Sequence, residues 1–528
     1  MQQTLDRPGK REGDDAALLQ WGEPPVSGGR EIELKLAVDE DGAARLKAHP
    51  ALTDIGATTA RQVSTYYDTP DAALREAGFS LRVRQAKGRF VQTIKQQGHG
   101  SAGMFDRPEW EEEIERAEPN LERAAKTPLG EHLGRKVRKR LEPLIRSDVE
   151  RTTWIVRRGE ADIEVVLDEG TVAGGAASER IAELELELKS GRPEALISFA
   201  RALGERTPLR LGVLTKAERG YALAAGLRGR VQKAEPIKLS PELTTAEGFA
   251  AIAASCLKHF RLNEEIVVAT RDPAALHQAR VAMRRLRSAF TFFRPVIADD
   301  TSPRLREEVR WFTNQLGEAR NLDVLLKRAP HGKHANAGDV ELTRTLEAAR
   351  ERAYAAVEEA MNSLRLRRLM LDLVGWIGTG AWRDGETTRR PLGEFGWSRL
   401  DQRWRKVKKG GRGIATLAME PLHSLRIEVK KLRYAVEFLA SLETRKEAIT
   451  RREAFSAALE DMQEHLGELN DVETARSLVG TLLAGQPHAE GMMTSAARWI
   501  AHHPHDKDPL KASEEAYGRL VEAGPYWR

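Results

Sequence analysis

Short segments in the first part of the chain alternate hydrophobic and polar side chains with a period of two. Residues 31–36 read Glu-Ile-Glu-Leu-Lys-Leu, and residues 183–189 read Glu-Leu-Glu-Leu-Glu-Leu-Lys. The alternation recurs, in full or in part, at residues 80–84, 109–115 and 163–168, with turn-forming residues between these segments. Such a pattern is typical of β-strands joined by hairpins. It predicts an antiparallel sheet or a closed barrel.

Hydrophobic residues change to a helical spacing after a linker at residues 226–242. Apolar side chains then recur every three or four residues at Ala279, Met283, Leu286, Phe290 and Phe293. A second stretch repeats this spacing at Leu425, Val429, Leu432, Val436 and Leu439. We therefore expect long amphipathic helices from residue 241 onward, packed as a bundle, with an irregular loop at residues 378–395.

Two motifs of the helical half occur twice, in the same order. The segment HQARVAMRRLR, from His277 to Arg287, returns 146 residues later as HSLRIEVKKLR, from His423 to Arg433. Likewise LGEARNLD, which begins at residue 316, is echoed 150 residues later by LGELND at residue 466. We infer that this half contains two copies of one helical unit.

Composition excludes several classes of protein. The 528 residues include 84 Lys and Arg against 79 Asp and Glu, a net charge of +5, and 41% are hydrophobic, which is enough for sizeable cores. The single cysteine, Cys256, rules out an internal disulfide framework and a cysteine-built zinc site. The N-terminus lacks the pattern of a signal peptide, and no apolar stretch is long enough to span a bilayer. We expect a soluble cytoplasmic protein with a disordered tail at residues 1–27.

Charged side chains share one face of the predicted strands. Glu31, Glu33 and Lys35 lie on one face of a strand, opposite three apolar residues, and Arg82 and Arg84 share a face in the same way. A half-buried sheet with these faces in water is the common arrangement. The alternative places the charges inside a barrel. There, clustered carboxylates would suit Mg²⁺ or Mn²⁺, and arginines would bind the phosphates of a polyanion.

A resemblance favours the second arrangement. Glu31-Ile-Glu33-Leu-Lys35 matches the ExExK signature of the CYTH, or triphosphate tunnel metalloenzyme, family. Further matching segments follow in order: Tyr67-Asp-Thr-Pro, Leu81-Arg-Val-Arg84, Thr93-Ile-Lys95, Arg107-Pro-Glu-Trp-Glu111, Leu167-Asp-Glu-Gly170, Ala182-Glu-Leu-Glu185 and Thr215-Lys-Ala-Glu-Arg-Gly-Tyr221. Over residues 28–225 the series resembles the inorganic triphosphatase branch of that family.

The resemblance implies an eight-stranded antiparallel tunnel that hydrolyses triphosphate with Mg²⁺ or Mn²⁺. The implied metal ligands are Glu31, Glu33, Asp168, Glu183 and Glu185, with Glu109 and Glu111 as weaker candidates. The implied phosphate contacts are Lys35, Arg82, Arg84, Lys95, Arg107, Arg151 and Lys216. Glu31, Glu33 and Lys35 are the implied catalytic residues, and Lys35 or a carboxylate would assist deprotonation of the attacking water. One departure is Glu150, an acidic residue where a second basic one is expected, which would weaken a phosphate contact.

Each copy of the duplicated motif carries a basic helical stripe. His277, Arg280, Arg284 and Arg287 are spaced to share one face of a helix, and the second copy supplies a matching set. Such stripes are usually solvated, but duplication favours a binding role, and the partners to consider are nucleic acid, anionic membrane and polyphosphate. Aromatic residues, at 6%, are too few to favour nucleic-acid stacking, and the apolar face is needed for the core rather than a membrane. The basic residues at 403–412 are expected on a loop.

The repeated motifs, with the Leu-Gly-Glu segments that follow, closely resemble the CHAD domain, the conserved histidine α-helical domain, over residues 243–483. The resemblance implies two similar bundles whose basic groove binds inorganic polyphosphate. The implied ligands are His277, Arg280, Arg284, Arg287, His423, Arg426, Lys430 and Arg433, with Arg285, Lys431 and Arg320 as helpers. Metal ligation or hydrogen bonding at a helix start are alternatives for the histidines, and phosphate contact is favoured over both.

Together these observations predict a multidomain α+β protein. A tail at 1–27 precedes a β tunnel with flanking helices at 28–225, a linker at 226–242, and an all-α domain at 243–528 that ends in a helical extension from residue 484. The leading functional hypothesis is a metal-dependent triphosphatase joined to a polyphosphate-binding domain, with a place at polyphosphate deposits. The alternatives are a polyphosphate-binding protein without enzymatic activity and an adenylate cyclase of the same superfamily. Protein partners are not predicted.

Overall fold

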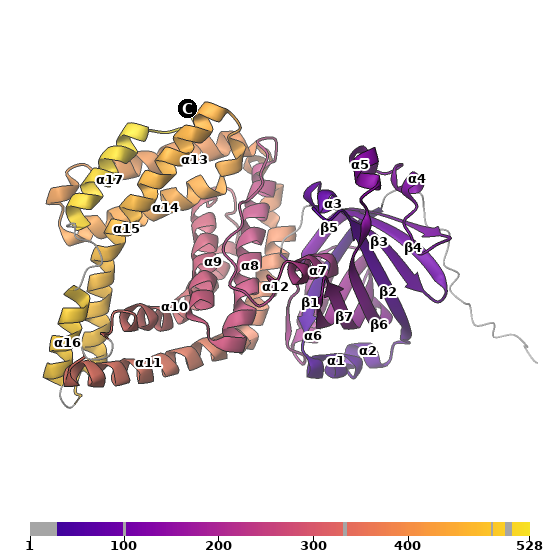
Figure 1. Cartoon of the computed structure of the whole chain (residues 1–528), viewed down its shortest axis with the longest axis horizontal. Coiled ribbons are helices and arrows are strands. Elements are labelled where there is room, and N and C mark those ends of the chain that lie inside the picture. Colours follow the sequence, from indigo (N-terminus) through magenta and orange to yellow (C-terminus); the bar gives the residue numbers. More distant parts are fainter. Residues whose placement is uncertain (1–28, 99–101, 331–334, 487–488, 502–508) are drawn as a thin grey trace, which may run out of the picture.

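Eight antiparallel strands close into a barrel in the computed structural model of the protein, which describes residues 29–98, 102–330, 335–486, 489–501 and 509–528 (Figure 1). The strands are β1 (Gly29–Val38), β2 (Thr58–Asp68), β3 (Phe79–Ala86), β4 (Arg89–Gln96), β5 (Met104–Ile114), β6 (Glu142–Arg158), β7 (Ala161–Gly174) and β8 (Ala177–Ser190). Their order around the barrel is β1-β5-β4-β3-β2-β6-β7-β8, and β8 pairs with β1 to close it. The predicted antiparallel tunnel is confirmed.

Short elements surround the barrel. A ninth strand, β9 (Leu209–Leu211), pairs with the end of β1. The helices of this part are α1 (Glu40–Lys47), α2 (Pro50–Thr53), α3 (Ala73–Glu76), α4 (Leu121–Ala124), α5 (Arg135–Arg138), α6 (Glu194–Gly204) and α7 (Lys216–Ala224). Between α4 and α5 runs a 3₁₀ helix at Pro128–His132.

Strand alternation sorts polar from apolar side chains as the sequence predicts. Glu31, Glu33 and Lys35 of β1 point into the barrel. Leu34 and Leu36, which point outward, are fully buried in the large core that includes helix α6. The arrangement with charges inside and apolar faces under helices is therefore the one observed. It reverses the usual distribution, in which apolar residues fill the centre of a barrel.

Helix α7 packs across one end of the barrel. Tyr66, Ile145 and Val172 form a small separate core with two residues of this helix, Ala217 and Leu223. Tyr221 of α7 also donates a hydrogen bond of 2.6 Å to the carboxylate of Asp68 at the end of β2. These contacts hold the helix so that its first residue, Lys216, reaches into the barrel.

Ten long helices form the second domain in the described part of the chain. They are α8 (Thr245–Thr270), α9 (Pro273–Phe292), α10 (Ser302–Leu326), α11 (Ala337–Asn362), α12 (Leu364–Thr379), α13 (Leu392–Gly410), α14 (Met419–Phe438), α15 (Lys446–Leu483), α16 (Ala489–Ala501) and α17 (Pro509–Ala523). The first copy of the repeated motif lies on α9 and the second on α14, and these two helices contact each other. The predicted all-α domain is confirmed, and none of the described helices is both long and apolar enough to cross a membrane.

Two segments differ from expectation. Residues 378–395 contain two short 3₁₀ helices, Ala381–Asp384 and Glu386–Arg389, and the start of α13. The basic segment 403–412, expected on a loop, lies mostly on α13, because Leu400, Trp404 and Val407 recur at helical spacing and are buried. Its high basic content and two glycines concealed this apolar stripe.

The two domains share one hydrophobic core. Leu34 and Leu196 of the barrel domain belong to the same cluster of buried residues as Phe249 and Leu371 of the helical domain. Ion pairs surround the junction: Arg368 of α12 binds Glu205 at 2.6 Å, and Arg201 of α6 binds Asp372. The domains are thus packed against each other as one body rather than joined by a free linker.

Replacing Phe249 with alanine should destabilise the whole protein. Its ring is fully buried and contacts four aromatic rings, those of Phe290, Phe293, Trp376 and Trp382. We expect the free energy of unfolding, measured by urea denaturation, to fall by about 3–5 kcal/mol. Ile427→Ala is the control, because Ile427 is exposed and its loss should cost less than about 0.5 kcal/mol. Equal losses in the two variants would contradict the prediction.

Candidate functional site

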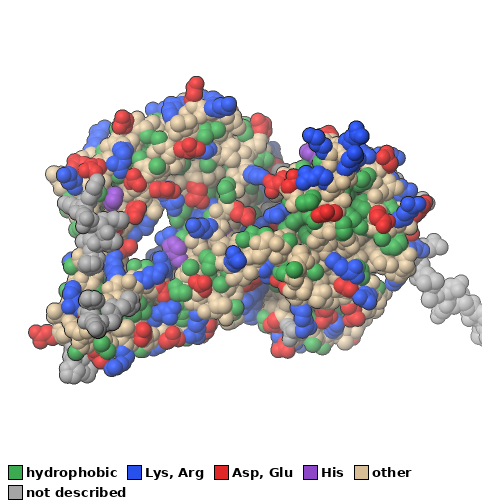
Figure 2. Space-filling view, viewed as in Figure 1, with side chains coloured by type: hydrophobic (Ala, Val, Ile, Leu, Met, Phe, Trp, Pro, Cys, Tyr) green, Lys and Arg blue, Asp and Glu red, His purple; other side chains and the backbone are tan. Residues whose placement is uncertain are grey.

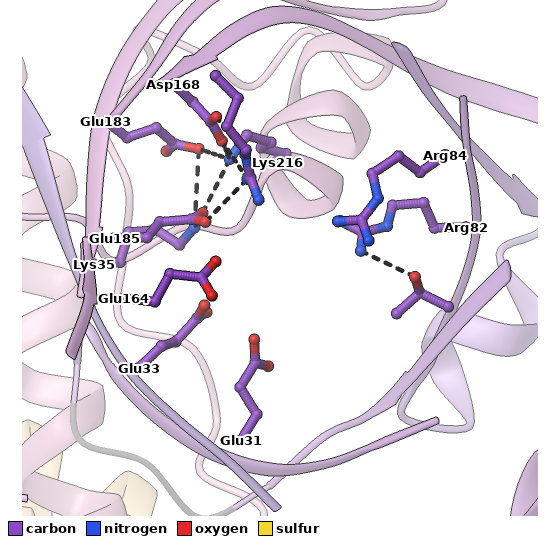
Figure 3. A network of polar contacts seen from close by, with 12 residues as sticks. Glu31, Glu33, Lys35, Arg82, Arg84, Glu164, Asp168, Glu183, Glu185 and Lys216 are labelled. Atoms are coloured by element: carbon purple, nitrogen blue, oxygen red, sulfur yellow. Dashed lines mark hydrogen bonds and ion pairs between the residues drawn. The ribbon is translucent and has the colours of Figure 1, made fainter. Parts of the chain in front are cut away.

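Acidic and basic side chains from all parts of the barrel wall point into its interior (Figure 3). One wall carries a group of carboxylates, those of Asp168 on β7 and of Glu183 and Glu185 on β8. Their oxygen atoms lie within 4.8 Å of one another, and Asp168 and Glu183 are almost fully buried. We call these three residues the acidic triad. Strand register brings them together, because Asp168 and Glu183 are direct neighbours across β7 and β8.

Three cations neutralise the acidic triad. Lys216 Nζ lies 2.8 Å from Asp168, 2.5 Å from Glu183 and 3.0 Å from Glu185. Arg151 donates two hydrogen bonds of 2.7 and 2.6 Å to the Asp168 carboxylate, the fork geometry that guanidinium groups favour. Lys35 donates to Glu185, its neighbour across β1 and β8. Each cation comes from a different element, namely α7, β6 and β1.

These pairings keep the acidic triad ionised. Burial by itself would raise the pKa of Glu183 and of Glu185, but the ammonium groups of Lys216 and Lys35 outweigh it and lower both. The pKa of Asp168 is lowered in the same way, against the effect of burial, by Lys216 and Arg151. The carboxylates are therefore charged and able to act as ligands for a cation.

A second group of charges surrounds the start of β1. Glu31 accepts two hydrogen bonds of 2.7 Å from Lys95 and one of 3.1 Å from Arg107, and Arg107 also donates to Glu33 at 2.7 Å. Burial would raise the pKa of Glu31, but Lys95 and Arg107 lower it overall. Glu109 lies 3.2 Å from Lys95. Burial, together with the charges of Glu31 and Glu111, raises the pKa of Glu109 to about 7.

Arg82 and Arg84 face the acidic triad from the opposite wall (Figure 3). Both lie near Glu111, at 3.4 and 3.3 Å, and Thr93 donates a hydrogen bond of 2.7 Å to the same carboxylate. One carboxylate thus serves two guanidinium groups. Burial and the charge of Arg82 lower the pKa of Arg84, whereas nearby groups that include Glu111 raise the pKa of Arg82 against the effect of burial. Because the two guanidinium groups share one carboxylate, this part of the wall has an excess of positive charge. An anion in the centre of the barrel would relieve that excess.

The acidic triad fits a divalent metal by its donor atoms. Carboxylate oxygens are the ligands that Mg²⁺ and Mn²⁺ prefer. Both oxygens of Glu183 are buried and accept no hydrogen bond from the described residues, although the Lys216 ammonium is close by. Glu31 and Glu33 lie elsewhere in the barrel, so the five sequence-predicted ligands fall into two separate groups. Among the described residues, only the acidic triad unites three possible ligands.

Glu150 does not weaken this site as the sequence suggested. It precedes Arg151 on β6, so the two side chains point to opposite faces of the strand. Glu150 is exposed and lines an outer hollow with Thr59 and Trp154, whereas Arg151 reaches Asp168 inside the barrel. Two residues that the sequence-based selection missed also belong to the interior. Glu164 lies between Glu185 and Glu33 (Figure 3), and Arg219 Nε is 3.8 Å from Glu183. The alternation in residues 163–168 was a signal for Glu164.

The duplicated motif builds a second candidate site, in the helical domain. The basic side chains that influence one another there come from both copies: His277, Arg280, Arg284, Arg287, Arg320, Arg426 and Lys430. We call this set the basic cluster. Arg284 is its centre, since its charge affects both Arg280 in its own copy and Lys430 in the other. Figure 2 shows basic side chains gathered at the opening between the two halves of this domain.

Mutual repulsion distinguishes the basic cluster from the barrel interior. Burial and neighbouring cations lower the pKa of Arg280 to about 10 and that of Lys430 to about 7. Burial and the charges of Arg320 and Arg284 lower the pKa of His277 to about 4. Asp471 lies 3.8 Å from Arg426 and compensates only part of this charge. The cluster therefore favours binding of a polyanion.

Other residues of the repeated motif are placed elsewhere. Arg285 is buried on another side of α9 and donates a hydrogen bond of 2.7 Å to Glu437. Lys431 binds Glu428 at 2.6 Å, and Arg433 donates to Gln463 at 2.7 Å. His423 is exposed near the start of α14, which begins at Met419. The structure thus brings together seven of the eleven residues that the sequence analysis predicts to bind polyphosphate.

Comparison with known proteins divides the chain in the same way. The family model described as "CYTH domain" matches residues 29–221, and the one described as "CHAD domain" matches residues 251–480. An inorganic triphosphatase from Haemophilus influenzae is 33% identical over 199 residues, which are 37% of this chain and 55% of that protein. The chain therefore spans little more than half the length of this relative.

Solved structures resemble each part separately. The CHAD domain from the plant Ricinus communis is 29% identical, with a TM-score of 0.49, over 55% of this chain and 96% of that one. A Hippeastrum protein, described as a suspected adenylyl cyclase that reveals a dominant triphosphatase activity, is 20% identical, with a TM-score of 0.27. That match covers 37% of this chain and 96% of the Hippeastrum chain.

Asp168→Asn should weaken metal binding in the barrel. The change keeps the shape of the side chain but removes one charged ligand from the acidic triad. We expect the affinity for Mn²⁺, measured by electron paramagnetic resonance of the free ion, to fall about tenfold or more. Glu169→Gln is the matched control, because the Glu169 carboxylate binds Lys47 on the outer face of the same strand. Wild-type Mn²⁺ affinity in Asp168→Asn would contradict the assignment.

Proposed function

This chain is a CYTH domain joined to a CHAD domain, and we propose that its barrel hydrolyses inorganic triphosphate while its helical domain binds inorganic polyphosphate. The observation that carries the first part is the arrangement of buried charge in the barrel. Carboxylates able to hold a metal occupy one wall, and an excess of arginine charge faces them across the interior. A polyphosphate that pairs with the cations of the interior would leave carboxylates of the acidic triad for a metal to neutralise.

Cations of the barrel wall would bind the substrate. Seven cations point into the barrel or pair with its buried carboxylates: Lys35, Lys95, Lys216, Arg82, Arg84, Arg107 and Arg151. On binding, each can exchange a carboxylate partner for a phosphate oxygen. Arginine is suited to this exchange because its planar fork matches phosphate as well as carboxylate. The substrate would then be held along the barrel with its terminal phosphorus oriented for attack by water.

The acidic triad would hold Mg²⁺ or Mn²⁺, and Glu31 and Glu33 form a second candidate carboxylate group. A bound divalent cation supplies charge neutralisation on phosphate oxygens and activates water. In the hydrolysis, water oxygen forms a bond to the terminal phosphorus and the phosphoanhydride bond breaks, which releases phosphate and pyrophosphate. The chain contributes positioning and electrostatic stabilisation, which are the main requirements of phosphoryl transfer.

The basic cluster supports the polyphosphate-binding role. Its cations come from two motif copies, are partly buried and lower one another's pKa, so an extended chain of phosphates would relieve repulsion at several points. Polyphosphate fits this requirement because it carries a charge on every unit. We place the protein in the cytoplasm, where a polyphosphate-binding domain would bring the barrel to polyphosphate deposits.

Tripolyphosphate should release phosphate in the presence of Mg²⁺ or Mn²⁺ and not in the presence of chelator. Glu31→Ala and Glu33→Ala should abolish this release, a loss of about 100-fold or more, because each change removes one of the two buried carboxylates that hold Arg107 in the barrel. Polyphosphate binding should survive in both variants. Full hydrolysis in both would contradict the site, and cyclic AMP formation from ATP in place of phosphate release would indicate a cyclase.

Polyphosphate binding should depend on pH through Lys430. Its pKa of about 7 means that the free protein carries this charge below pH 7 and loses it above. Polyphosphate stabilises the charged form, so affinity should be greatest below pH 7 and fall as the pH rises from 7 to 9. The measurement is isothermal titration calorimetry at constant ionic strength. Lys430→Arg should bind with a flatter pH profile, since arginine stays charged, and an unchanged profile would contradict this role.

A further inference from the structure

The start of helix α7 is fixed by a capping box whose acidic residue is Glu218. The Thr215 hydroxyl accepts a hydrogen bond of 3.1 Å from the backbone N–H of Glu218, and Glu218 Oε2 accepts one of 2.8 Å from the backbone N–H of Thr215. Lys216 follows this cap directly. Its ammonium group reaches all three carboxylates of the acidic triad. The position of the cap therefore determines where that ammonium group lies.

A residue of the helical domain binds the same carboxylate from the other side. Lys258 of α8 donates a hydrogen bond of 3.0 Å to Glu218 Oε1. The two oxygens of Glu218 thus have separate tasks, one within the barrel domain and one across the junction. Lys258 itself lies outside the barrel, beside residues 232–237, and does not reach the acidic triad.

A second chain of ion pairs links the same two helices. Arg219 of α7 binds Glu179 of β8 at 3.2 Å, and Glu179 also binds Arg228 at 2.9 Å. Arg228 in turn lies 3.5 Å from Glu265 of α8. Because Arg219 Nε is also 3.8 Å from Glu183, this network runs from the acidic triad to the helical domain. Helix α7 is therefore linked to α8 at two points, directly through Glu218 and indirectly through Arg219.

We propose that Lys258 is a positioning residue for Lys216, so that the helical domain completes the site inside the barrel. Lys258 acts through Glu218 and the first turn of α7, and it touches neither the acidic triad nor the interior cations. This inference rests on the proposed function, because the reaction it serves is triphosphate hydrolysis. It assigns to the helical domain a role in the barrel that is separate from polyphosphate binding.

The physical reason is that geometry, rather than stability, depends on this contact. The side chains of Lys258 and Glu218 are 31% and 33% exposed, and ion pairs of such exposure contribute little to folding. Lys216, in contrast, must reach three buried carboxylates at once, and small displacements of a positioned group are costly for catalysis. Loss of Lys258 should therefore leave the protein folded while it lets the cap and Lys216 move.

Lys258→Met tests the proposal in the full-length protein. We expect the rate of tripolyphosphate hydrolysis with Mg²⁺ to fall about tenfold, with the melting temperature and polyphosphate affinity unchanged. Lys258→Arg should restore most of the rate, because arginine keeps the charge toward Glu218. The matched control is Arg368→Met, which removes another ion pair of the junction, the one between α12 and Glu205 at the end of α6. Wild-type kinetics in Lys258→Met, or an equal loss in Arg368→Met, would overturn the proposal.

A double-mutant cycle distinguishes positioning from a general structural effect. Tripolyphosphate binding is measured by calorimetry without metal in Lys216→Met, Lys258→Met and the double variant. If Lys258 acts through Lys216, the change Lys258→Met should weaken tripolyphosphate binding in the wild-type background. In the Lys216→Met background the same change should cause no further loss of affinity. Additive losses would overturn the proposal. Binding without hydrolysis in the wild type would overturn the proposed enzymatic function alone, because the cycle would still report on Lys258.

Discussion

Neutralisation of buried charge is the constraint on which this structure depends. An ion removed from water without a partner costs several kcal/mol, so each charged residue inside the barrel needs an opposite charge in contact. Arg151 with Asp168 and Lys35 with Glu185 meet this need across neighbouring strands. The same pairs that stabilise the barrel also keep its carboxylates ionised. The interior is thus stable without a ligand and already carries both halves of a site for one.

In the helical domain, by contrast, charges of the same sign lie close together. Arg280, Arg284 and Lys430 face other cations, and their repulsion is a cost that the hydrophobic core of the domain has to offset. The two motif copies do not contribute equally. The first copy supplies Arg320, whereas the matching position in the sequence of the second copy is Asn470, followed by Asp471 near Arg426. The positive charge is therefore greatest where the two copies meet at Arg284.

Much of the barrel could be predicted because a strand has a period of two. Once Glu31, Glu33 and Lys35 were seen to alternate with apolar residues, only two arrangements were possible, and the family signature favoured the observed one. Pairing could not be predicted, since the contact of Arg151 with Asp168 depends on strand register. Lys216 was predicted through the family resemblance alone, because local sequence does not reveal that α7 brings its side chain into the barrel. In the helical domain, spacing identified the basic stripes but not that Arg285 turns away toward Glu437.

The common core of the two domains has a consequence for polymers of different length. A flexible tether lets a second site search a volume, and it helps ligands of any size. Here Phe249 and Leu34 belong to one packed core, so the separation between the basic cluster and the barrel is fixed. A fixed distance between two sites distinguishes ligands by their length. Under the proposed function, a phosphate chain shorter than that distance would occupy one site at a time, while a longer chain would engage both and gain affinity from the second.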